Sequence, residues 1–312
     1  MTRLIDIRVA EDETDAWREG LLAGMAGRGL SIAGPEVPKS DIDYLVYNID
    51  SGLMDFADYT GLRAIFNTWA GLEQVLGRVT WPDHVPFCRM VEPGLTEGMV
   101  EYFLAHVLRY HMEVDTFQAN SAAGIWDKLE PPLARDRTVG ILGLGALGQA
   151  TAEALVPLRF KVCGWSRSPK DIAGVTCFHG ADGLAETLKR SEILVVILPQ
   201  TAATIHILNA ETLALMPKGA RIINAGRGPL IDDDALLDAL ASGQIGHATL
   251  DVFSTEPLPS DRAFWGHPSV TVTPHIAAVT RAGSASQAIL QQIDRHMAGE
   301  PLLHIVDSAR GY

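Results

Sequence analysis

A glycine-rich turn between a strand-like run and a helical run constrains this chain more than any other feature. The run Thr138 to Leu142 is short and apolar, as a buried strand is, and Gln149 to Val156 has helical spacing. The three glycines between them suit a tight bend, the close approach of a pyrophosphate and the packing of helix on strand. The turn therefore predicts a dinucleotide-binding unit. Its candidate cofactor contacts are Gly143, Gly145, Ala146, Leu147 and Gly148.

Strand-like and helical runs alternate along the chain in two groups. The strand-like runs of the first group are Leu4 to Val9, Tyr44 to Asn48, Leu62 to Phe66 and Phe87 to Val91, and its helical runs are Asp12 to Ala26 and Leu72 to Leu76. The strand-like runs of the second group are Thr138 to Leu142, Phe160 to Trp165, Ile193 to Leu198, Arg221 to Asn224, His247 to Phe253 and Val270 to Thr273. Alternation of this kind predicts the α/β class, with parallel sheets wrapped by helices. A helical run at Thr96 to Gln118 leads from the first group to the second, and another at Ala277 to Met297 leads back. We therefore expect two domains, the first of them discontinuous.

The length and charge of the chain narrow the function classes. Its 312 residues suffice for about two domains of roughly 150 residues each. A formal net charge of -13 argues against nucleic acid, since binding a phosphate backbone needs a basic face. No apolar run reaches about 18 residues and no signal peptide is recognisable, so we expect a cytoplasmic protein that does not bind membranes.

Neither the cysteines nor the acidic run suggests a metal site. Cys88, Cys163 and Cys177 are widely spaced and lack a CxxC pair, so we expect reduced thiols in the core. The run Asp232 to Asp234 precedes a helical stretch, where carboxylates cap the helix and complement its dipole. We therefore predict no metal.

The residues that end the next strand-like run favour NADPH. NAD sites usually carry an Asp or Glu about 20 residues beyond the glycine turn. Here the run that begins at Phe160 ends in serines and an arginine instead. Arginine can pair with a 2′-phosphate that a carboxylate would repel, and serines can donate hydrogen bonds to it. We predict NADPH as the preferred cofactor, with NADH as the alternative. The candidate contacts are Trp165, Ser166, Arg167, Ser168 and Lys170.

A cation, a carboxylate and an imidazole follow later strand-like runs, in the order Arg227, Glu256, His275. Hydride delivery to a ketone builds negative charge on its oxygen, and imidazolium is the proton donor best matched to neutral pH. Glu256 would stabilise that charged imidazole, while Arg227 could hold a carboxylate and polarise the carbonyl. Gly226 and Gly228 suggest backbone pressed close to a ligand. We predict that Arg227, Glu256 and His275 form the catalytic set.

Several motifs together indicate a family. They are GLGALG, WSRS, LPQT at Leu198 to Thr201, NAGRG at Asn224 to Gly228, LDVFSTEPLP at Leu250 to Pro259, TPHIAAVT at Thr273 to Thr280 and the ending ARGY. On these the chain resembles the D-isomer-specific 2-hydroxyacid dehydrogenases over nearly its whole length, and most closely the glyoxylate/hydroxypyruvate reductases of the A type. The resemblance implies a Rossmann-type doubly wound cofactor domain at residues 96–284, which includes the hinge helices. It also implies a flavodoxin-like α/β substrate domain at residues 1–95 and 285–312.

The resemblance assigns roles in the cofactor domain. The family's catalytic Arg, Glu and His fall on Arg227, Glu256 and His275, and Asp251 would contact the nicotinamide amide. The further cofactor contacts that it implies are Leu198, Pro199, Thr204, Ala225 and Gly226.

The resemblance also marks a substrate loop in the first domain. Ala70 and Gly71 would offer backbone N–H groups to the substrate carboxylate. Trp69 stands where many relatives carry a glycine, so its ring could narrow the pocket or point away. Tyr47 is a candidate for the pocket wall.

The family implies a homodimer that acts on a small 2-oxo acid. The loop-like stretch Asn120 to Pro132 carries Trp126, and such a ring either lies in a subunit interface or packs within its own chain. We expect NADPH-dependent reduction of glyoxylate to glycolate and of hydroxypyruvate to D-glycerate. The alternatives are a D-2-hydroxyacid dehydrogenase that acts on another 2-oxo acid, and a nucleotide-sensing, corepressor-like binding protein.

Overall fold

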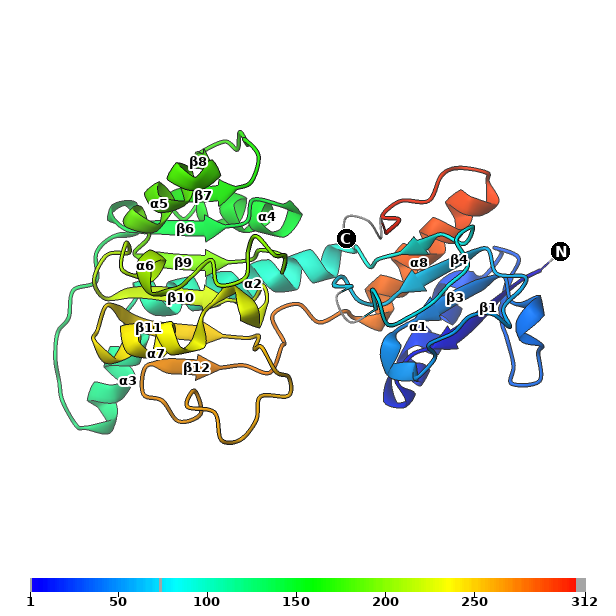
Figure 1. Ribbon diagram of the computed structural model, residues 1–312, viewed down its shortest axis with the longest axis horizontal. Helices are drawn as coiled ribbons and strands as arrows, with labels where there is room; N and C mark the ends of the chain where they lie inside the picture. The colour runs from blue at the N-terminus through cyan, green and yellow to red at the C-terminus, as the bar shows by residue number, and fades with distance from the viewer. Residues whose placement is uncertain (1, 73–74, 307–312) are drawn as a thin grey trace. The chain divides into compact units, whose positions relative to one another are not determined.

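The computed structural model describes residues 2–72 and 75–306, and it divides the chain into two compact units. Unit 1 comprises Met1–Leu95 and Thr280–Tyr312, and unit 2 comprises Thr96–Val279 (Figure 1). Parallel sheets and helices in both units confirm the α/β class. The second boundary precedes residue 280 and not residue 285, because helix α8 (Ala282–Met297) packs along helix α1 (Thr14–Met25) of unit 1.

Unit 2 is built on a seven-stranded parallel sheet. Its strands are β6 (Thr138–Leu142), β7 (Lys161–Ser166), β8 (Val175–His179), β9 (Ile193–Val196), β10 (Ala220–Asn224), β11 (Ile245–Leu250) and β12 (Val270–Val272). The order across the sheet is β12-β11-β10-β9-β6-β7-β8, so the chain starts in the middle and winds outward to both edges. This is the doubly wound arrangement of dinucleotide-binding sheets, with its switch point between β6 and β9.

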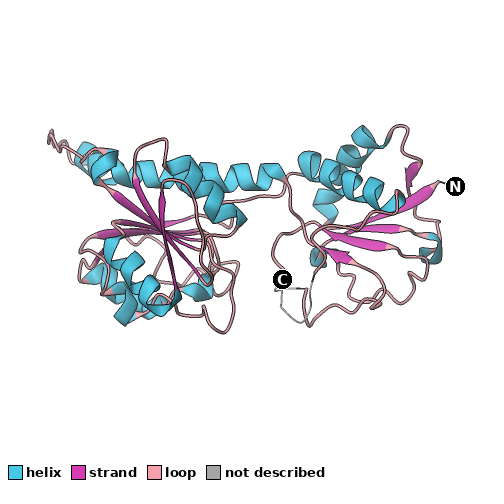
Figure 2. Cartoon of the chain, turned by 90° about the horizontal axis from the view of Figure 1, so that it is seen from above, coloured by secondary structure: helices cyan, strands magenta, loops and turns pink. Residues whose placement is uncertain are grey.

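Helices cover both faces of this sheet (Figure 2). The helices from the connecting segment onward are α2 (Pro93–His111), α3 (Val114–Ala122), η4 (Ala134–Asp136), α4 (Ala146–Leu155), α5 (Gly180–Arg190), α6 (Ala210–Leu213), η5 (Gly228–Leu230) and α7 (Asp233–Ala241). Helices α5, α6 and α7 pack on one face through buried leucines, and α2 and α4 pack on the other through Phe103 and Leu155. Because both faces are buried, β9 has the sequence ILVV with every residue inside.

The described residues of unit 1 form a five-stranded parallel sheet. Its strands are β1 (Arg3–Arg8), β2 (Leu30–Ile32), β3 (Tyr44–Tyr47), β4 (Ala64–Asn67) and β5 (Phe87–Cys88), with short helices η1 (Glu11–Glu13), η2 (Lys39–Asp41) and η3 (Ile49–Ser51) in the connections. The order β2-β1-β3-β4-β5 is the flavodoxin-like one. Helices α1 and α8 cover one face of the sheet, and a second core cluster rich in aromatic residues lies on the other face.

The connecting segment forms two helices where the sequence suggested one. Helix α2 ends at His111 and α3 begins at Val114, because Glu113 has a left-handed conformation with φ of 53°. The Glu113 carboxylate lies 2.7 Å from Arg221 and 3.6 Å from Arg137, which are charges at the start of the sheet. The break between the two helices therefore places the Glu113 carboxylate next to both arginines. No helix in the described ranges has the length and hydropathy to cross a membrane.

The chain returns to unit 1 after α8. The Arg89 N–H donates to the His304 carbonyl (3.1 Å), and the Val306 N–H donates to the Phe87 carbonyl (2.8 Å), so this segment runs along β5. The expected return thus holds as far as residue 306, and residues 307–312 lie outside the described part. The helical run expected at Leu72 to Leu76 includes residues 73–74, which also lie outside it.

Candidate active site

Four loops of unit 2 carry the expected site residues, and each begins where a strand ends. The glycine turn follows β6, Arg227 follows β10, Asp251 and Glu256 follow β11, and His275 follows β12. Since the strands are parallel, all four loops leave the sheet at the same edge. Doubly wound sheets bind their ligands at this edge.

His275 and Glu256 form a hydrogen-bonded pair. The Nδ1 atom of His275 lies 2.7 Å from Oε2 of Glu256. The other carboxylate oxygen, Oε1, accepts a hydrogen bond of 2.8 Å from the Phe253 N–H, so Glu256 is held from two sides. The His275 side chain is still 53% exposed. Its Nε2 is therefore the ring nitrogen that can exchange a proton with a ligand.

The surroundings favour the charged form of both partners. The hydrogen bond to Glu256 raises the pKa of His275 above its ordinary value, against the opposing effects of burial and of the Arg227 charge. Burial alone would raise the pKa of Glu256, but hydrogen bonds from His275 and the Phe253 N–H, together with nearby positive charge, lower it below its ordinary value. Both shifts favour an imidazolium next to a carboxylate.

The carboxylate of Asp251 holds the loop that carries His275. Asp251 is 1% exposed. Its Oδ1 accepts hydrogen bonds from the Thr273 hydroxyl (2.5 Å) and the Ile276 N–H (2.9 Å), and its Oδ2 accepts one from the Ala277 N–H (2.9 Å). Sequence reasoning missed this bracing role, and Thr273 was not among the candidate site residues. The contact of Asp251 with a nicotinamide amide stays a prediction.

His275 itself has a left-handed backbone conformation, with φ of 54°. A side chain held in this region is strained by roughly 1–3 kcal/mol, and such strain persists only where the surroundings impose it. The His275 N–H donates to the Asp251 carbonyl (2.9 Å), with the Thr273 carbonyl also in reach at 3.1 Å. Asp251 therefore fixes the loop through both its backbone and its side chain.

Arg227 lies in a turn that Asn224 closes. The Asn224 amide donates to the Arg227 carbonyl (3.0 Å) and its oxygen accepts from the Gly226 N–H (3.1 Å). The chain itself needs glycine at both flanking positions, and their closeness to a ligand stays a prediction. A Cβ on Gly226 would lie 2.9 Å from the Leu198 carbonyl oxygen, and one on Gly228 would lie 2.0 Å from the Phe253 carbonyl carbon. The glycines are needed because the chain packs against itself there.

In the glycine turn, local backbone geometry requires two of the three glycines, and the third has open space beside it. Gly143 has φ of 110°, and a Cβ on Gly148 would lie 1.8 Å from the Gly143 carbonyl oxygen, so both positions are fixed by local geometry. A Cβ on Gly145 would meet nothing within 4 Å. Helix α4 then begins at the exposed Ala146 with no side-chain cap and no acidic residue in its first turn. This open, uncapped helix end fits a pyrophosphate.

At the end of β7, two of the candidate residues are hydrogen-bonded within the chain, and the three that follow are exposed. The Trp165 indole N–H donates to the Gly180 carbonyl (2.7 Å), and the Ser166 hydroxyl donates to the Ser168 carbonyl (2.8 Å). The Ser166 proton is therefore already engaged within the turn, contrary to the expectation that both serines would donate to a phosphate. The exposed side chains are those of Arg167, Ser168 and Lys170.

The expected cofactor contacts after β9 and β10 are mostly buried. The Thr204 hydroxyl donates to the Pro199 carbonyl (2.7 Å) and accepts from the Thr201 N–H (2.8 Å), so it braces its own loop. Leu198 and Ala225 are only 7% and 5% exposed, whereas Pro199 is exposed. Of these residues, Pro199 has the most surface that a cofactor can reach.

The loop after β4 in unit 1 is held by its Trp69 carbonyl. This oxygen accepts hydrogen bonds from the Asn67 side chain (2.8 Å) and the Met90 N–H (3.1 Å). The N–H groups of Ala70 and Gly71 have no acceptor among the described residues. The Trp69 ring packs against the aromatic core cluster of unit 1.

Tyr47 does not form part of a pocket wall. The residue is 0% exposed, and its hydroxyl donates to the Leu53 carbonyl at 2.8 Å. Its ring meets those of Phe56 and Phe87 edge to face. The expectation was wrong because an aromatic residue at a strand end serves a core as readily as a ligand site.

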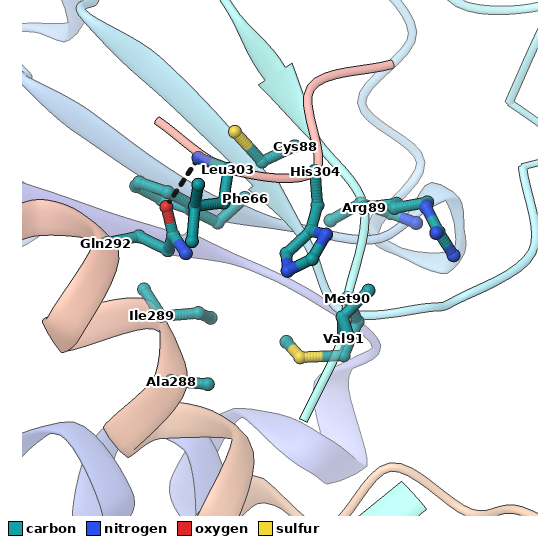
Figure 3. Close-up of a pocket in the computed structure, with 11 residues that line it drawn as sticks. Phe66, Cys88, Arg89, Met90, Val91, Ala288, Ile289, Gln292, Leu303 and His304 are labelled. Carbon is teal, nitrogen blue, oxygen red and sulfur yellow. Dashed lines mark hydrogen bonds between the residues drawn. The ribbon is translucent and has the colours of Figure 1, made fainter. Parts of the chain in front are cut away.

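A small hollow in unit 1 is lined by residues of β4, β5, α8 and the returning segment, among them Asn67, Arg89 and His304 (Figure 3). The side-chain oxygen of Gln292 accepts a hydrogen bond of 2.9 Å from the Leu303 N–H beside it. The hollow has a volume of about 20 Å³, which is room for a water molecule and not for an organic acid. The hollow is therefore not a substrate site.

The acidic run before α7 serves the helix. Asp232 is the N-cap residue, and its carboxylate accepts a hydrogen bond of 3.2 Å from the Ala235 N–H. This confirms the interpretation of the run as a helix start. Within residues 2–72 and 75–306, no group of three or more His, Cys, Asp or Glu side chains is arranged to hold a metal ion.

Comparison with known proteins places this architecture in a family. Residues 104–277 match the family model of the D-isomer specific 2-hydroxyacid dehydrogenase NAD binding domain. The chain is 41% identical over 256 residues to glyoxylate/hydroxypyruvate reductase A of Serratia proteamaculans, which covers 80% of this chain and 82% of that protein.

Two solved structures superpose on the whole chain. One is a D-isomer specific 2-hydroxyacid dehydrogenase from Xanthobacter autotrophicus in complex with NADPH and MES, at 38% identity and a TM-score of 0.90. The other is an NADPH-dependent glyoxylate/hydroxypyruvate reductase from Sinorhizobium meliloti in complex with NADP and sulfate, at 36% identity and a TM-score of 0.87. Each alignment covers 100% of both chains. The sequence match and the doubly wound sheet agree, and the chain belongs to the D-isomer-specific 2-hydroxyacid dehydrogenases.

Proposed function

We propose that this protein reduces small 2-oxo acids with NADPH in the cytoplasm, converting glyoxylate to glycolate and hydroxypyruvate to D-glycerate. The observation that carries the proposal is the 2.7 Å hydrogen bond between His275 and Glu256. It gives an exposed imidazole with a raised pKa, at the sheet edge where such folds bind their ligands. The names of the similar proteins from Serratia and Sinorhizobium support these substrates and this cofactor.

His275 is the proposed general acid. Its imidazolium donates the Nε2 proton to the carbonyl oxygen of the 2-oxo acid as negative charge develops there. Glu256 keeps the ring charged beforehand and holds it in orientation through Nδ1. In the reverse direction the neutral ring accepts the proton. A positioned acid of this kind contributes typically about 10²- to 10⁴-fold in rate.

Arg227 is the proposed anchor for the substrate carboxylate. A guanidinium binds a carboxylate through two parallel hydrogen bonds, and its charge also stabilises a developing oxyanion. The turn closed by Asn224 limits the freedom of the Arg227 backbone. We propose the N–H groups of Ala70 and Gly71 as further donors to the carboxylate, since no described residue accepts from them.

The residues of unit 2 fit NADPH. The uncapped start of α4 beside the open Gly145 suits the pyrophosphate, and the exposed Arg167 and Lys170 suit a 2′-phosphate. When bound, NADPH supplies the hydride for the reduction. The assignment of the phosphate contact to Arg167 is the part that mutation can test most sharply.

A panel of substrates tests the activity. We expect the protein to oxidise NADPH fastest with glyoxylate or hydroxypyruvate and more slowly with pyruvate, followed by the absorbance of the reduced nicotinamide. A clear preference for another 2-oxo acid would instead favour a different D-2-hydroxyacid dehydrogenase. Tight NADPH binding without turnover of any acid in the panel would contradict the reductase and favour a nucleotide sensor.

Glu256→Gln tests the role of the pair. The substitution removes the charge that raises the pKa of His275, so that pKa falls. Because reduction requires imidazolium and is lost as pH rises through the pKa of His275, the alkaline limb of the kcat/KM profile should move to lower pH. The loss of a charge-assisted hydrogen bond should also lower kcat by about 10- to 100-fold. An alkaline limb that stays in place would remove Glu256 from this role.

Arg167→Ala tests the cofactor preference. We expect KM for NADPH to rise by about 10- to 100-fold and KM for NADH to change by less than about threefold, because only NADPH carries the 2′-phosphate. Lys161→Ala is the matched control, since it removes one positive charge at the opposite end of the same strand. Equal losses for both nicotinamides in Arg167→Ala would point to general damage.

We also propose a homodimer, on the basis of exposed apolar side chains after α3. Ile125 is 56%, Trp126 91% and Leu133 56% exposed, which is costly for side chains of this size in water. Light scattering should give the mass of two chains, and Trp126→Ser should shift the equilibrium toward one. A monomeric wild-type protein would refute the dimer.

A further inference from the structure

Hydrogen-bonded hydroxyl groups connect helix α2 to the loop that carries His275. The Tyr102 hydroxyl lies 2.8 Å from Oγ1 of Thr273, and the Thr273 hydroxyl lies 2.5 Å from Oδ1 of Asp251. Asp251 in turn binds the N–H groups of Ile276 and Ala277, on the far side of His275. One continuous path of hydrogen bonds thus connects α2, the residues that directly follow β12 and β11, and the loop of the proposed acid.

The direction of these hydrogen bonds follows from the groups. A carboxylate only accepts, so the single proton of the Thr273 hydroxyl is donated to Asp251. The oxygen of Thr273 must then accept from Tyr102. Burial raises the pKa of Tyr102 well above its ordinary value, which keeps the phenol protonated and able to donate. The order of donation is therefore Tyr102 to Thr273 to Asp251.

We propose that Tyr102 and Thr273 are positioning residues for the proton donor, acting through Asp251. They orient the carboxylate whose hydrogen bonds hold His275 in its left-handed conformation and so keep the imidazole within 2.7 Å of Glu256. The role of His275 as the acid rests on the proposed function. The influence of Tyr102 on the ring of His275 does not, because it is a property of the free protein.

The other charged and titratable groups near this path are few. On α2, the ring centroids of His106 and Tyr102 lie 4.5 Å apart. Burial lowers the pKa of His106, which favours its neutral form. Arg109, also on α2, is paired with Asp115 at 2.7 Å. Around His275 the groups are Glu256, Arg227 and Asp251.

The same helix offers a matched control. Tyr110, two turns farther along α2, bonds through its hydroxyl to Oγ1 of Thr249 at 2.6 Å. Thr249 lies inside β11, and its hydroxyl is not among the described donors to the Asp251 carboxylate. Tyr110→Phe therefore removes a buried tyrosine–threonine hydrogen bond of the same kind and leaves every hydrogen bond from Tyr102 to Asp251 in place.

The first experiment compares turnover in Tyr102→Phe, Thr273→Val, Thr273→Ser and Tyr110→Phe. We expect kcat to fall about five- to tenfold in Tyr102→Phe and about tenfold or more in Thr273→Val, with KM for NADPH unchanged within about twofold. Thr273→Ser keeps the hydroxyl and should restore most of the rate. Tyr110→Phe should lose thermal stability to a similar extent as Tyr102→Phe and keep the wild-type kcat and pH profile.

The second experiment titrates His275 by NMR in protein with isotope-labelled histidine, without substrate or cofactor. The signal that disappears in His275→Gln identifies the residue. The hydrogen bond to Glu256 and the charges of Glu256 and Asp251 raise the pKa of His275, so a looser loop should lower that pKa in Tyr102→Phe and Thr273→Val. The pKa should be unchanged in Tyr110→Phe and close to wild type in Thr273→Ser.

The two experiments separate the two hypotheses. A wild-type protein without turnover, in which Tyr102→Phe still lowers the pKa of His275, would refute the reductase and keep the positioning role. An unchanged pKa of His275 in Tyr102→Phe and Thr273→Val would refute the positioning role whatever the turnover. Equal effects of Tyr102→Phe and Tyr110→Phe on the pKa would refute it too, since the path would then have no specific influence.

Discussion

The candidate site depends on the hydrogen bonds that the buried carboxylate of Asp251 accepts. A left-handed conformation at His275 costs roughly 1–3 kcal/mol, whereas each hydrogen bond to a charged group contributes about 1.5–3 kcal/mol. Three such bonds converge on Asp251, from the hydroxyl and N–H groups that surround His275. These hydrogen bonds offset the strain and hold the loop in the conformation that brings the imidazole to Glu256.

The parallel sheet determines which residues can meet. Because β6, β10, β11 and β12 end at one edge, residues more than a hundred positions apart can serve a single ligand. Close packing at that edge then requires glycine at 148 and 228 for reasons internal to the chain. Gly145 is different, because space is open beside it, and this fits its proposed contact with the cofactor.

The sequence was sufficient for the α/β class and for the outline of both sheets, because central strands such as β9 are unbroken apolar runs. It missed β2 and β8, which lie at sheet edges, where part of each strand faces solvent and the apolar run is interrupted. The break at Glu113 depends on arginines that are distant in sequence, and no local pattern reports such a pairing.

The candidate site divides in the same way. Arg227, Glu256 and His275 were recognisable from residue type and strand-end spacing, although their roles remain proposals. The hydrogen bonds that connect Asp251, Thr273 and Tyr102 were not recognisable, because threonine and tyrosine are common in and beside strands and helices without any such role. The prediction for Tyr47 was wrong because its position at a strand end suggested a pocket wall, whereas its side chain is fully buried in the core.

A single-turnover experiment tests the central claim most directly. Protein saturated with NADPH is mixed rapidly with glyoxylate, and the decay of the reduced nicotinamide is recorded for wild type and for His275→Gln. If His275 is the proton donor, the variant should bind NADPH with an affinity within about threefold of wild type and transfer hydride about 10²- to 10⁴-fold more slowly. Hydride transfer at the wild-type rate in His275→Gln would contradict the account.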